Sequence, residues 1–325
     1  MKIAQCGAML AVLSAVAGGM TNRAFGEDSP VAAAGTVTVG AGAAATTPAT
    51  AAAPVAPAII VREGSGEAPD PCRTGEVAAN ATRPAWDYAA STTQCGVIES
   101  DFGWLGQATG PGVNQQMVVS SIRYGLTPRL DLRWGLTNHI WQNGSGSESL
   151  QGTGDQWLGG RYRFQEQGRV IPAIAFLYAG RVPQANPAKG FGSGFADHQF
   201  VLIVSRDLGK YHFDFNTVGT LAGGAHGHDG AAQFGLALTR PVTKKLSGIL
   251  ESYGGGQPGT PDRFGAAFAG ATFAVRPQLA IDAAYTRTYT AGSPREQVLF
   301  GITYARRAGF SPLSRRFAAA RVLGR

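Results

Sequence analysis

Ionisable side chains alternate with apolar ones along several segments of this chain. Leu130-Asp131-Leu132-Arg133 carries an acid and a base at alternate positions, and His212-Phe213-Asp214 carries a histidine and a carboxylate in the same way. A histidine beside a carboxylate can act as a general acid or base, and a serine within reach would complete a hydrolytic site. None of the five histidines lies two residues from a serine. We therefore predict no catalytic residue, although a serine distant in the sequence stays open.

Two further stretches could bind a metal or a phosphate group. His226-Gly227-His228-Asp229 offers metal ligands, but no third clear ligand in a rigid frame accompanies them, so a flexible loop is expected. Gly190-Phe191-Gly192-Ser193-Gly194 has no helix pattern after it, which excludes a nucleotide-binding loop. The sequence contains no P-loop with its lysine, no H-E-x-x-H and no C-x-x-C. We predict neither a metal nor a cofactor.

The first 26 residues have the parts of a secretory signal peptide. Lys2 supplies the basic start, residues 3–19 form an apolar stretch, and Ala24-Phe25-Gly26 places small residues at a cleavage site. A transmembrane anchor is the alternative, but glycines and polar residues weaken the apolar stretch. The segment predicts export of the chain, with residues 1–26 removed.

Cys72 and Cys95 are the two cysteines that remain after removal of this segment. An exported chain enters an oxidising compartment, so a disulfide between them is the simplest expectation, and two unpaired thiols are the alternative. The bond would close a loop of about 24 residues and contribute roughly 3 kcal/mol in the chain-entropy model.

Composition narrows the fold class. The 325 residues include 46 glycines, and 15% of the residues are charged, whereas ordinary domains have about half that share of glycine and about 25% charged residues. No second apolar stretch of about 18 residues follows the N-terminus, which excludes a helical membrane protein. The hydrophobic share of 44% excludes full disorder. An all-β chain of short, glycine-spaced strands remains.

The segments that precede the periodic region differ from it in composition. Residues 27–60 are rich in alanine, proline and threonine, and residues 29–60 carry no charge, so we predict a disordered linker there. Residues 61–93 are polar and interrupted by prolines, and we expect them to form a periplasmic segment or a partial plug.

From residue 94 to residue 306, apolar residues recur at every second position in twelve segments of about 9–14 residues, the length of tilted strands that span a bilayer. Five short turns alternate with six longer, glycine-rich connections, among them 142–154 and 222–231. Outer-membrane barrels have short turns on the periplasmic side and longer external loops. We predict a transmembrane up-and-down antiparallel β-barrel of about 12 strands in the bacterial outer membrane, with a soluble β-sandwich as the alternative.

If the apolar face meets lipid, the alternate face lines the barrel interior. The lumen-lining candidates on that face are Glu99, Asp101, Arg123, Asp131, Arg133, His139, Asp155, Arg161, Arg163, His212, Asp214, Asn216 and Asp282. Their charges either pair across the wall and partly fill a narrow barrel, or tune the passage of solutes. Twelve strands leave a smaller lumen than the 16–18 strands of open porins, which favours selective passage of small solutes.

Two stretches of the sequence resemble motifs of a bacterial outer-membrane family. Tyr124-Gly125-Leu126-Thr127-Pro128-Arg129-Leu130-Asp131-Leu132-Arg133 is similar to one of its hairpins, and Gly154-Asp155-Gln156-Trp157-Leu158-Gly159-Gly160-Arg161-Tyr162 to one of its strands. The family is the MetA-pathway phenol-degradation family, whose members are often labelled transporters. The resemblance extends from about residue 83 to residue 304. It implies an outer-membrane barrel that passes aromatic or other hydrophobic compounds, and it brings no catalytic or binding residues.

The end of the chain departs from the usual pattern of such barrels. Phe300-Gly301-Ile302-Thr303-Tyr304 has the pattern of a last strand, whose terminal aromatic is read by the barrel-assembly machinery, but an arginine-rich tail over residues 307–325 follows. The tail is either solvated in the periplasm or binds acidic partners such as phosphate head groups. The compartment argues against nucleic acid.

These observations predict an outer-membrane channel for the passive uptake or export of small molecules, aromatic or hydrophobic ones among them. Its expected partners are outer-membrane lipid, the barrel-assembly machinery and a small-molecule solute. A barrel enzyme acting on lipids and a structural or surface-interaction barrel are the alternatives.

Overall fold

The computed structural model describes Cys72 and residues 75–110, 113–144, 149–257, 263–290 and 295–308. The predicted signal peptide (1–26) and linker (27–60) lie outside the described residues, as does nearly all of the arginine-rich tail. Of the predicted segment 61–93, the described part is Cys72 and the residues from 75 onward.

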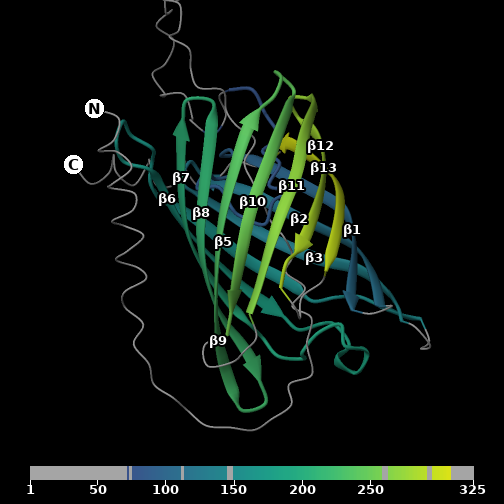
Figure 1. Cartoon of the computed structure of the whole chain (residues 1–325). Helices are drawn as coiled ribbons and strands as arrows, with labels where there is room; N and C mark the ends of the chain where they lie inside the picture. The colour runs from purple at the N-terminus through teal and green to yellow at the C-terminus, as the bar shows by residue number, and fades with distance from the viewer. Residues whose placement is uncertain are drawn as a thin grey trace, which may run out of the picture.

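Twelve long antiparallel strands close into a barrel, with one short extra strand (Figure 1). The strands are β1 (Val97–Gly110), β2 (Val113–Thr127), β3 (Leu130–Asn143), β4 (Leu150–Gly152), β5 (Gln156–Gln165), β6 (Ala173–Val182), β7 (His198–Leu208), β8 (Tyr211–Gly224), β9 (Gly227–Pro241), β10 (Leu246–Gly256), β11 (Arg263–Arg276), β12 (Leu279–Thr288) and β13 (Glu296–Arg307). The barrel closes because β1 pairs with both β2 and β13. The predicted all-β, up-and-down barrel of 12 strands is confirmed. The short 3-10 helix η1 (Pro187–Lys189) lies between β6 and β7, and no helix of the described residues is long and apolar enough to cross a membrane.

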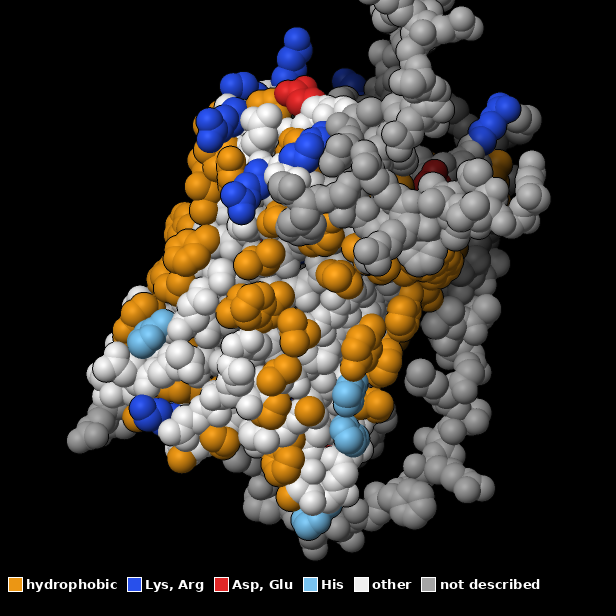
Figure 2. Space-filling view, turned by 180° about the vertical axis from the view of Figure 1, so that it is seen from behind, with side chains coloured by type: hydrophobic (Ala, Val, Ile, Leu, Met, Phe, Trp, Pro, Cys, Tyr) orange, Lys and Arg blue, Asp and Glu red, His pale blue; other side chains and the backbone are white. Residues whose placement is uncertain are grey.

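The period-2 pattern of each strand separates an outer from an inner face. On β12, Ile281 and Tyr285 are exposed, whereas Ala280, Asp282 and Ala284 are buried. On the face shown in Figure 2, hydrophobic side chains are spread over the outer wall between the two ends of the barrel. An apolar surface of this extent is stable only against lipid, and the closed ladder satisfies the backbone groups that lipid cannot.

The connections differ in length at the two ends of the barrel. Short turns join the strands at one end, such as Gly209 and Lys210 between β7 and β8, at the top of Figure 1. At the other end, two predicted loops are partly strand. Residues 150–152 form β4 inside the predicted loop 142–154, and the predicted loop 222–231 is a hairpin, because β8 and β9 stay paired up to Gly224 and Gly227. The glycine-rich composition indicated a loop there, but cross-strand pairing continues through it.

Candidate functional site: the barrel lumen and its closures

A segment of the chain that precedes β1 lies inside the barrel. This luminal loop, residues 75–94, is flanked by Cys72 and Cys95, which form a disulfide with their Cα atoms 4.7 Å apart. Cys95 forms a bridge to Gly125, near the end of β2. Both ends of the luminal loop therefore lie at the short-turn end of the barrel, and the residues between them extend into the lumen.

Three carboxylates of the wall, Glu99, Asp131 and Glu251, accept hydrogen bonds from backbone N–H groups of the luminal loop. The nitrogen–oxygen distances are 2.6 Å from Asn80 to Glu99, 2.8 Å from Thr93 to Asp131, and 2.8 Å from both Trp86 and Asp87 to Glu251. A buried N–H group without a partner is costly, and bonds to charged acceptors are stronger than neutral ones. The carboxylates of the lumen therefore hold the loop in place.

Two arginines of the wall balance Glu99 and Asp131, together with the neighbouring carboxylate of Asp101. Arg123 lies 3.0 Å from Glu99 and 3.1 Å from Asp101, and Arg161 lies 2.7 Å from Asp131. Each guanidinium also donates to a backbone carbonyl of the luminal loop, at 2.9 Å and 2.6 Å respectively. All five side chains are buried. Replacing either the acidic or the basic partner by a neutral residue would leave an uncompensated buried charge. The two ion clusters and the luminal loop therefore depend on each other.

Three further predicted lumen residues also contact the luminal loop. The guanidinium of Arg133 lies over the ring of Tyr88, 5.3 Å from its centroid. Asn216 accepts from the backbone N–H of Tyr88 at 3.0 Å and donates to its carbonyl at 2.8 Å. Asp282 lies 3.7 Å from the guanidinium of Arg83. These predicted lumen residues therefore contact the luminal loop of the same chain.

His212 bridges two carboxylates near the short turns. Its Nδ1 lies 2.6 Å from Asp207 and its Nε2 lies 3.0 Å from Asp214. The hydroxyl of Ser205 donates to the same Asp214 at 2.5 Å. Both ring nitrogens face carboxylates, so neither is placed to take a proton from Ser205. A histidine, a serine and an aspartate are brought together here, but in an arrangement that does not activate the hydroxyl.

Arg163 and Asp155 lie near the two ends of the barrel. Arg163 donates to the carbonyl of Pro128 in a short turn at 3.0 Å. Asp155, just before β5, accepts from the backbone N–H groups of Gln184 and Ala185 at 2.8 Å each. The first supports a turn, and the second shapes the connection between β6 and β7.

His139 lies on the outer face of the barrel, so its predicted place in the lumen is wrong. Thr137 and His139 pair with consecutive residues of β2, which leaves Asn138 as an extra residue. Such a β-bulge reverses the alternation beyond it. Ile140 is therefore buried inside, and the His139 ring lies 4.3 Å from that of Trp141 on the outer wall.

The lumen beside the long loops is apolar. The inward side chains of this apolar layer include Leu105, Met117, Ile140, Phe268 and Leu299, from five strands of the wall. Their position was missed because the alternation was read as apolar outside and polar or glycine inside. Consecutive apolar residues, as in Met117-Val118-Val119 and Val298-Leu299-Phe300, break that pattern and are its visible signal.

The connection between β6 and β7, residues 183–197, closes the apolar layer. Phe191 of this connection is 4% exposed and belongs to the same buried cluster as the apolar layer. Arg181 holds the connection, since it lies 2.7 Å from Asp197 and 3.5 Å from Asp155. We call residues 183–197 the closing loop.

Four glutamines line the mouth of the barrel beyond the apolar layer. Gln297 donates to Gln107 at 2.9 Å, Gln107 to Gln115 at 2.6 Å, and Gln115 to Gln142 at 3.1 Å. Each lies two residues from a member of the apolar layer, on the same face of its strand. The mouth is thus lined by neutral amides that bond to one another across four adjacent strands.

Sequence reasoning missed Glu251 as well as these glutamines. In Ile249-Leu250-Glu251-Ser252-Tyr253, the residues at alternate positions mix apolar and polar types on both faces. Polarity alone therefore gives no inner face there. The luminal residues Arg83 and Asp87 were missed for another reason, because they lie outside any strand and only the fold brings them inside.

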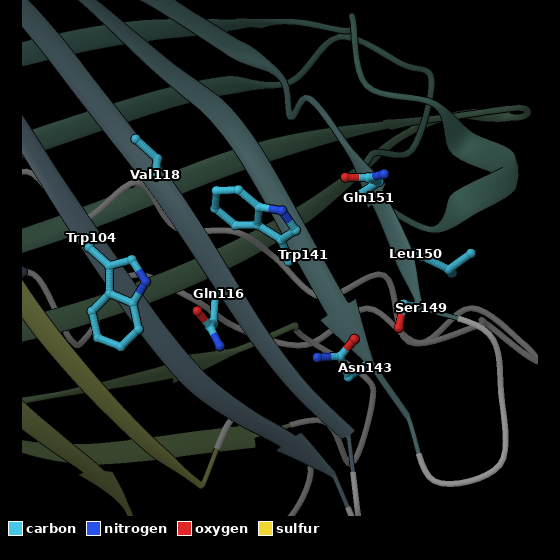
Figure 3. Close-up of a pocket in the computed structure, with 8 residues that line it drawn as sticks. All are labelled: Trp104, Gln116, Val118, Trp141, Asn143, Ser149, Leu150 and Gln151. Atoms are coloured by element: carbon cyan, nitrogen blue, oxygen red, sulfur yellow. The ribbon is translucent and has the colours of Figure 1, made fainter.

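A groove of about 540 Å³ lies on the outer wall beside the long loops. It is lined by Trp104, Gln116, Val118, Trp141, Asn143, Ser149, Leu150 and Gln151. The two indoles flank the amide of Gln116 in Figure 3. None of the lining residues is charged, and their strands also form the lipid-facing surface. Leu150 also packs against the buried cluster of the apolar layer, so the groove adjoins that layer at this residue.

The predicted histidine motif in 226–229 falls at the tip of the β8–β9 hairpin. The rings of His228 and His198 lie 5.8 Å apart, and Nδ1 of His198 lies 2.8 Å from the hydroxyl of Tyr178. Across the part of the chain that the structure describes, histidine, cysteine and acidic residues form no group of three or more that could hold a metal ion.

The closed barrel, its apolar outer wall and its filled, charged lumen define an outer-membrane β-barrel, and this places the molecule in the bacterial outer membrane. Among solved structures, the fold is similar to the COG4313 outer-membrane channel from Pseudomonas putida F1, with a TM-score of 0.52 and 15% identity over 67% of this chain and 98% of that one.

Other barrels are similar at lower scores. The NanC porin matches with a TM-score of 0.46 and 7% identity over 64% of this chain and 98% of its own. The CymD monoaromatic hydrocarbon channel matches with a TM-score of 0.41 and 9% identity over 65% of this chain and 88% of its own. No protein-family model and no curated protein sequence matches the chain. The COG4313 channel shares its fold with the present chain.

Proposed function

We propose that this barrel is a gated channel that passes small, partly apolar molecules, aromatic compounds among them, passively across the outer membrane. The observation that carries the proposal is that the lumen is closed by two inserted segments. Barrels of about eight strands are filled by wall side chains alone, whereas a larger barrel leaves interior space. Here the luminal loop and the closing loop occupy that space, and noncovalent contacts with the wall hold both.

The lining of the lumen supports this solute class. A molecule that enters from the long loops would first meet the neutral amides of the four glutamines and then the apolar layer. Apart from Asp155, Arg181 and Asp197, which pair with one another where they hold the closing loop, the charged groups come only after that, beside the luminal loop. A small molecule with an apolar body and few polar groups is desolvated at low cost in the apolar layer, whereas an ion is not.

The resemblance to the MetA-pathway phenol-degradation family supports the same solute class, and we propose that the chain is a member. The solved structure with the higher TM-score is described as an outer-membrane channel, which agrees with the proposed activity. A barrel enzyme acting on lipids fits the site less well, because both nitrogens of His212 face carboxylates and the nearby Ser205 bonds to Asp214.

Conductance and liposome swelling test the proposal. Purified barrel in planar bilayers should show small, intermittent conductance, and liposomes that contain it should take up phenol faster than protein-free liposomes, which phenol crosses on its own. Phe191→Ala should raise the open probability severalfold, because it removes the apolar stopper of the closing loop. Phe195→Ala is the matched control, since Phe195 lies in the same loop but is 41% exposed. Electrically silent bilayers for both the native chain and Phe191→Ala, with phenol uptake no faster than in protein-free liposomes, would contradict the proposal.

A further inference from the structure

The short-turn end of the barrel carries a ring of exposed basic side chains. We call it the basic rim, and its members are Arg129, Arg169, Lys210, Arg240, Lys244, Lys245, Arg276 and Arg306. Three exposed acids lie at this end among the described residues. Glu166 is 3.3 Å from Arg163 and 4.0 Å from Arg129 of the rim, Asp207 is 2.6 Å from His212, and Glu76 lies in the luminal loop. Figure 2 shows Lys and Arg side chains gathered at this end of the molecule. The basic rim therefore has an uncompensated positive charge.

The basic rim borders exposed apolar side chains of the outer wall. Lys210 is followed by Tyr211, and Val275 is followed by Arg276. Tyr211 and Val275 are 41% and 40% exposed, on the surface that meets lipid. The guanidinium of Arg240 lies over the Tyr211 ring, 5.4 Å from its centroid. Basic groups in this position lie at the boundary between hydrocarbon and water, which is the depth of lipid head groups.

The opposite end has a smaller excess of positive charge among the residues that the structure describes. Its exposed charges are Lys189, Arg263, Arg287 and Arg295 with Asp229 and Glu296. Arg287 and Glu296 form an ion pair at 2.7 Å. The positive charge of the barrel surface is therefore concentrated where the short turns meet the membrane.

We propose that the basic rim binds phosphatidylglycerol head groups in the leaflet that faces the short turns. Short turns of outer-membrane barrels are periplasmic, and that leaflet is built of phospholipids, so the phosphate that meets the rim belongs to a phospholipid. Lysine and arginine beside an anionic surface attract it additively, and their apolar neighbours hold them at phosphate depth. The bound lipids fix the depth and orientation of the barrel. This inference is independent of the channel proposal.

Native mass spectrometry of the full mature chain, released from detergent micelles that contain defined lipids, tests this inference. The native barrel should retain phosphatidylglycerol at least about tenfold more than phosphatidylcholine, as several basic groups acting together imply. Lys210→Glu with Lys244→Glu should abolish most of that preference. Arg263→Glu with Arg295→Glu makes the same change in net charge at the opposite end and should leave the preference intact.

Each other outcome overturns the assignment. Equal retention of the two lipids by the native barrel would do so, as would equal losses in the two charge-reversed variants. The native barrel could instead retain lipid A more strongly than phosphatidylglycerol and lose that preference on the Lys210 and Lys244 changes. This result would assign the rim to the other leaflet. Heat-modifiable gel mobility verifies the folding of each variant. If the charge-reversed rim variant fails to fold, Lys210→Gln with Lys244→Gln replaces it. That milder variant should lose part of the preference for phosphatidylglycerol.

Discussion

Trp86 of the luminal loop stacks on Tyr253 of β10, with ring centroids 4.9 Å apart and planes inclined by 7°. Glu251, two residues before Tyr253 on the same face of the strand, accepts the backbone N–H of Trp86 at 2.8 Å. One residue of the luminal loop is thus bound to the wall by an aromatic contact and by a charged hydrogen bond. The disulfide holds the ends of the loop, and this pair of contacts holds its middle.

Trp86→Ala should release the middle of the luminal loop. Trp86 is 9% exposed, and truncating a buried tryptophan typically costs about 3–5 kcal/mol. We expect the cost to fall on the closed position of the loop more than on the barrel, because the strand ladder does not include Trp86. Single-channel recording should show a higher open probability with unchanged heat-modifiable mobility of the barrel.

Trp134→Ala is the control for that variant, since Trp134 is 40% exposed on the outer wall. Recordings in which both tryptophan variants open the channel equally would argue against a role of the Trp86–Tyr253 contact in closure.

Gly235→Ala should displace the luminal loop from the neighbouring strand β9, where Gly235 pairs with Tyr253. A Cβ atom at Gly235 on β9 would lie 2.1 Å from Oδ1 of Asp87, closer than real Cβ contacts, so the buried Asp87 side chain must shift, and we expect the loop to move with it. At Gly219 on β8 an added Cβ would meet nothing within 4 Å, which makes Gly219→Ala the matched control. Hydrogen exchange of residues 75–94 should become faster in Gly235→Ala by tenfold or more. Equal exchange in the two alanine variants would show that the loop tolerates the added methyl group without moving.

Cys72→Ser with Cys95→Ser should weaken the closed state without opening the strand ladder. The disulfide joins residues 23 apart in sequence, and closure of a loop of that length contributes roughly 3 kcal/mol in the chain-entropy model. We expect a lower urea midpoint for exposure of the luminal loop, measured by hydrogen exchange of residues 75–94 at increasing urea concentrations. A reductant should reproduce this change in the native chain and have no further effect on the double variant. If reductant leaves the urea midpoint of the native chain unchanged, the expected role of the disulfide is contradicted.

Alternation and turn length allowed the barrel to be predicted, because lipid imposes one rule on the outer face of every strand. The same rule fails where a local irregularity changes the face. The extra residue Asn138 reverses the alternation, and nothing in Leu136-Thr137-Asn138-His139 distinguishes a bulge from a regular strand. The paired residues of the β8–β9 hairpin were predicted as a loop for a similar reason, since glycine and alanine carry no periodic signal.

The inner face could be predicted only in part, because its partners are not local. Asp131 and Glu99 are inward by alternation, but the groups that they bind belong to a segment with no periodic pattern of its own. Phe191 lies in a glycine-rich connection and becomes part of the lumen only because Asp155, Arg181 and Asp197 fold that connection inward. Such contacts depend on the closed barrel, which no stretch of sequence contains.

Asp87 should make closure depend on pH. It lies in the luminal loop and not in a membrane-spanning strand, it is fully buried, and its carboxylate oxygens have no hydrogen-bond partner among the described residues. Burial, and then the nearby carboxylates of Glu251 and Asp214, raise the pKa of Asp87 from 3.8 to about 10. Between pH 3.8 and about pH 10, Asp87 therefore keeps its proton in the closed loop and gives it up in the released loop. The closed state is therefore most stable below about pH 4 and loses stability as pH rises toward 10, by at most about 1.4 kcal/mol for each pH unit.

The open probability should accordingly increase when the pH is raised from 5 to 8. Asp87→Asn keeps the size of the side chain but cannot titrate, so its open probability should vary little over that range. The native channel and Asp87→Asn are compared by single-channel recording at both pH values and constant salt, because surface charges also respond to ionic strength. An equal pH response in the two proteins would assign the titration to another group, and a native channel that closes as pH rises would contradict the sign derived from the burial of Asp87.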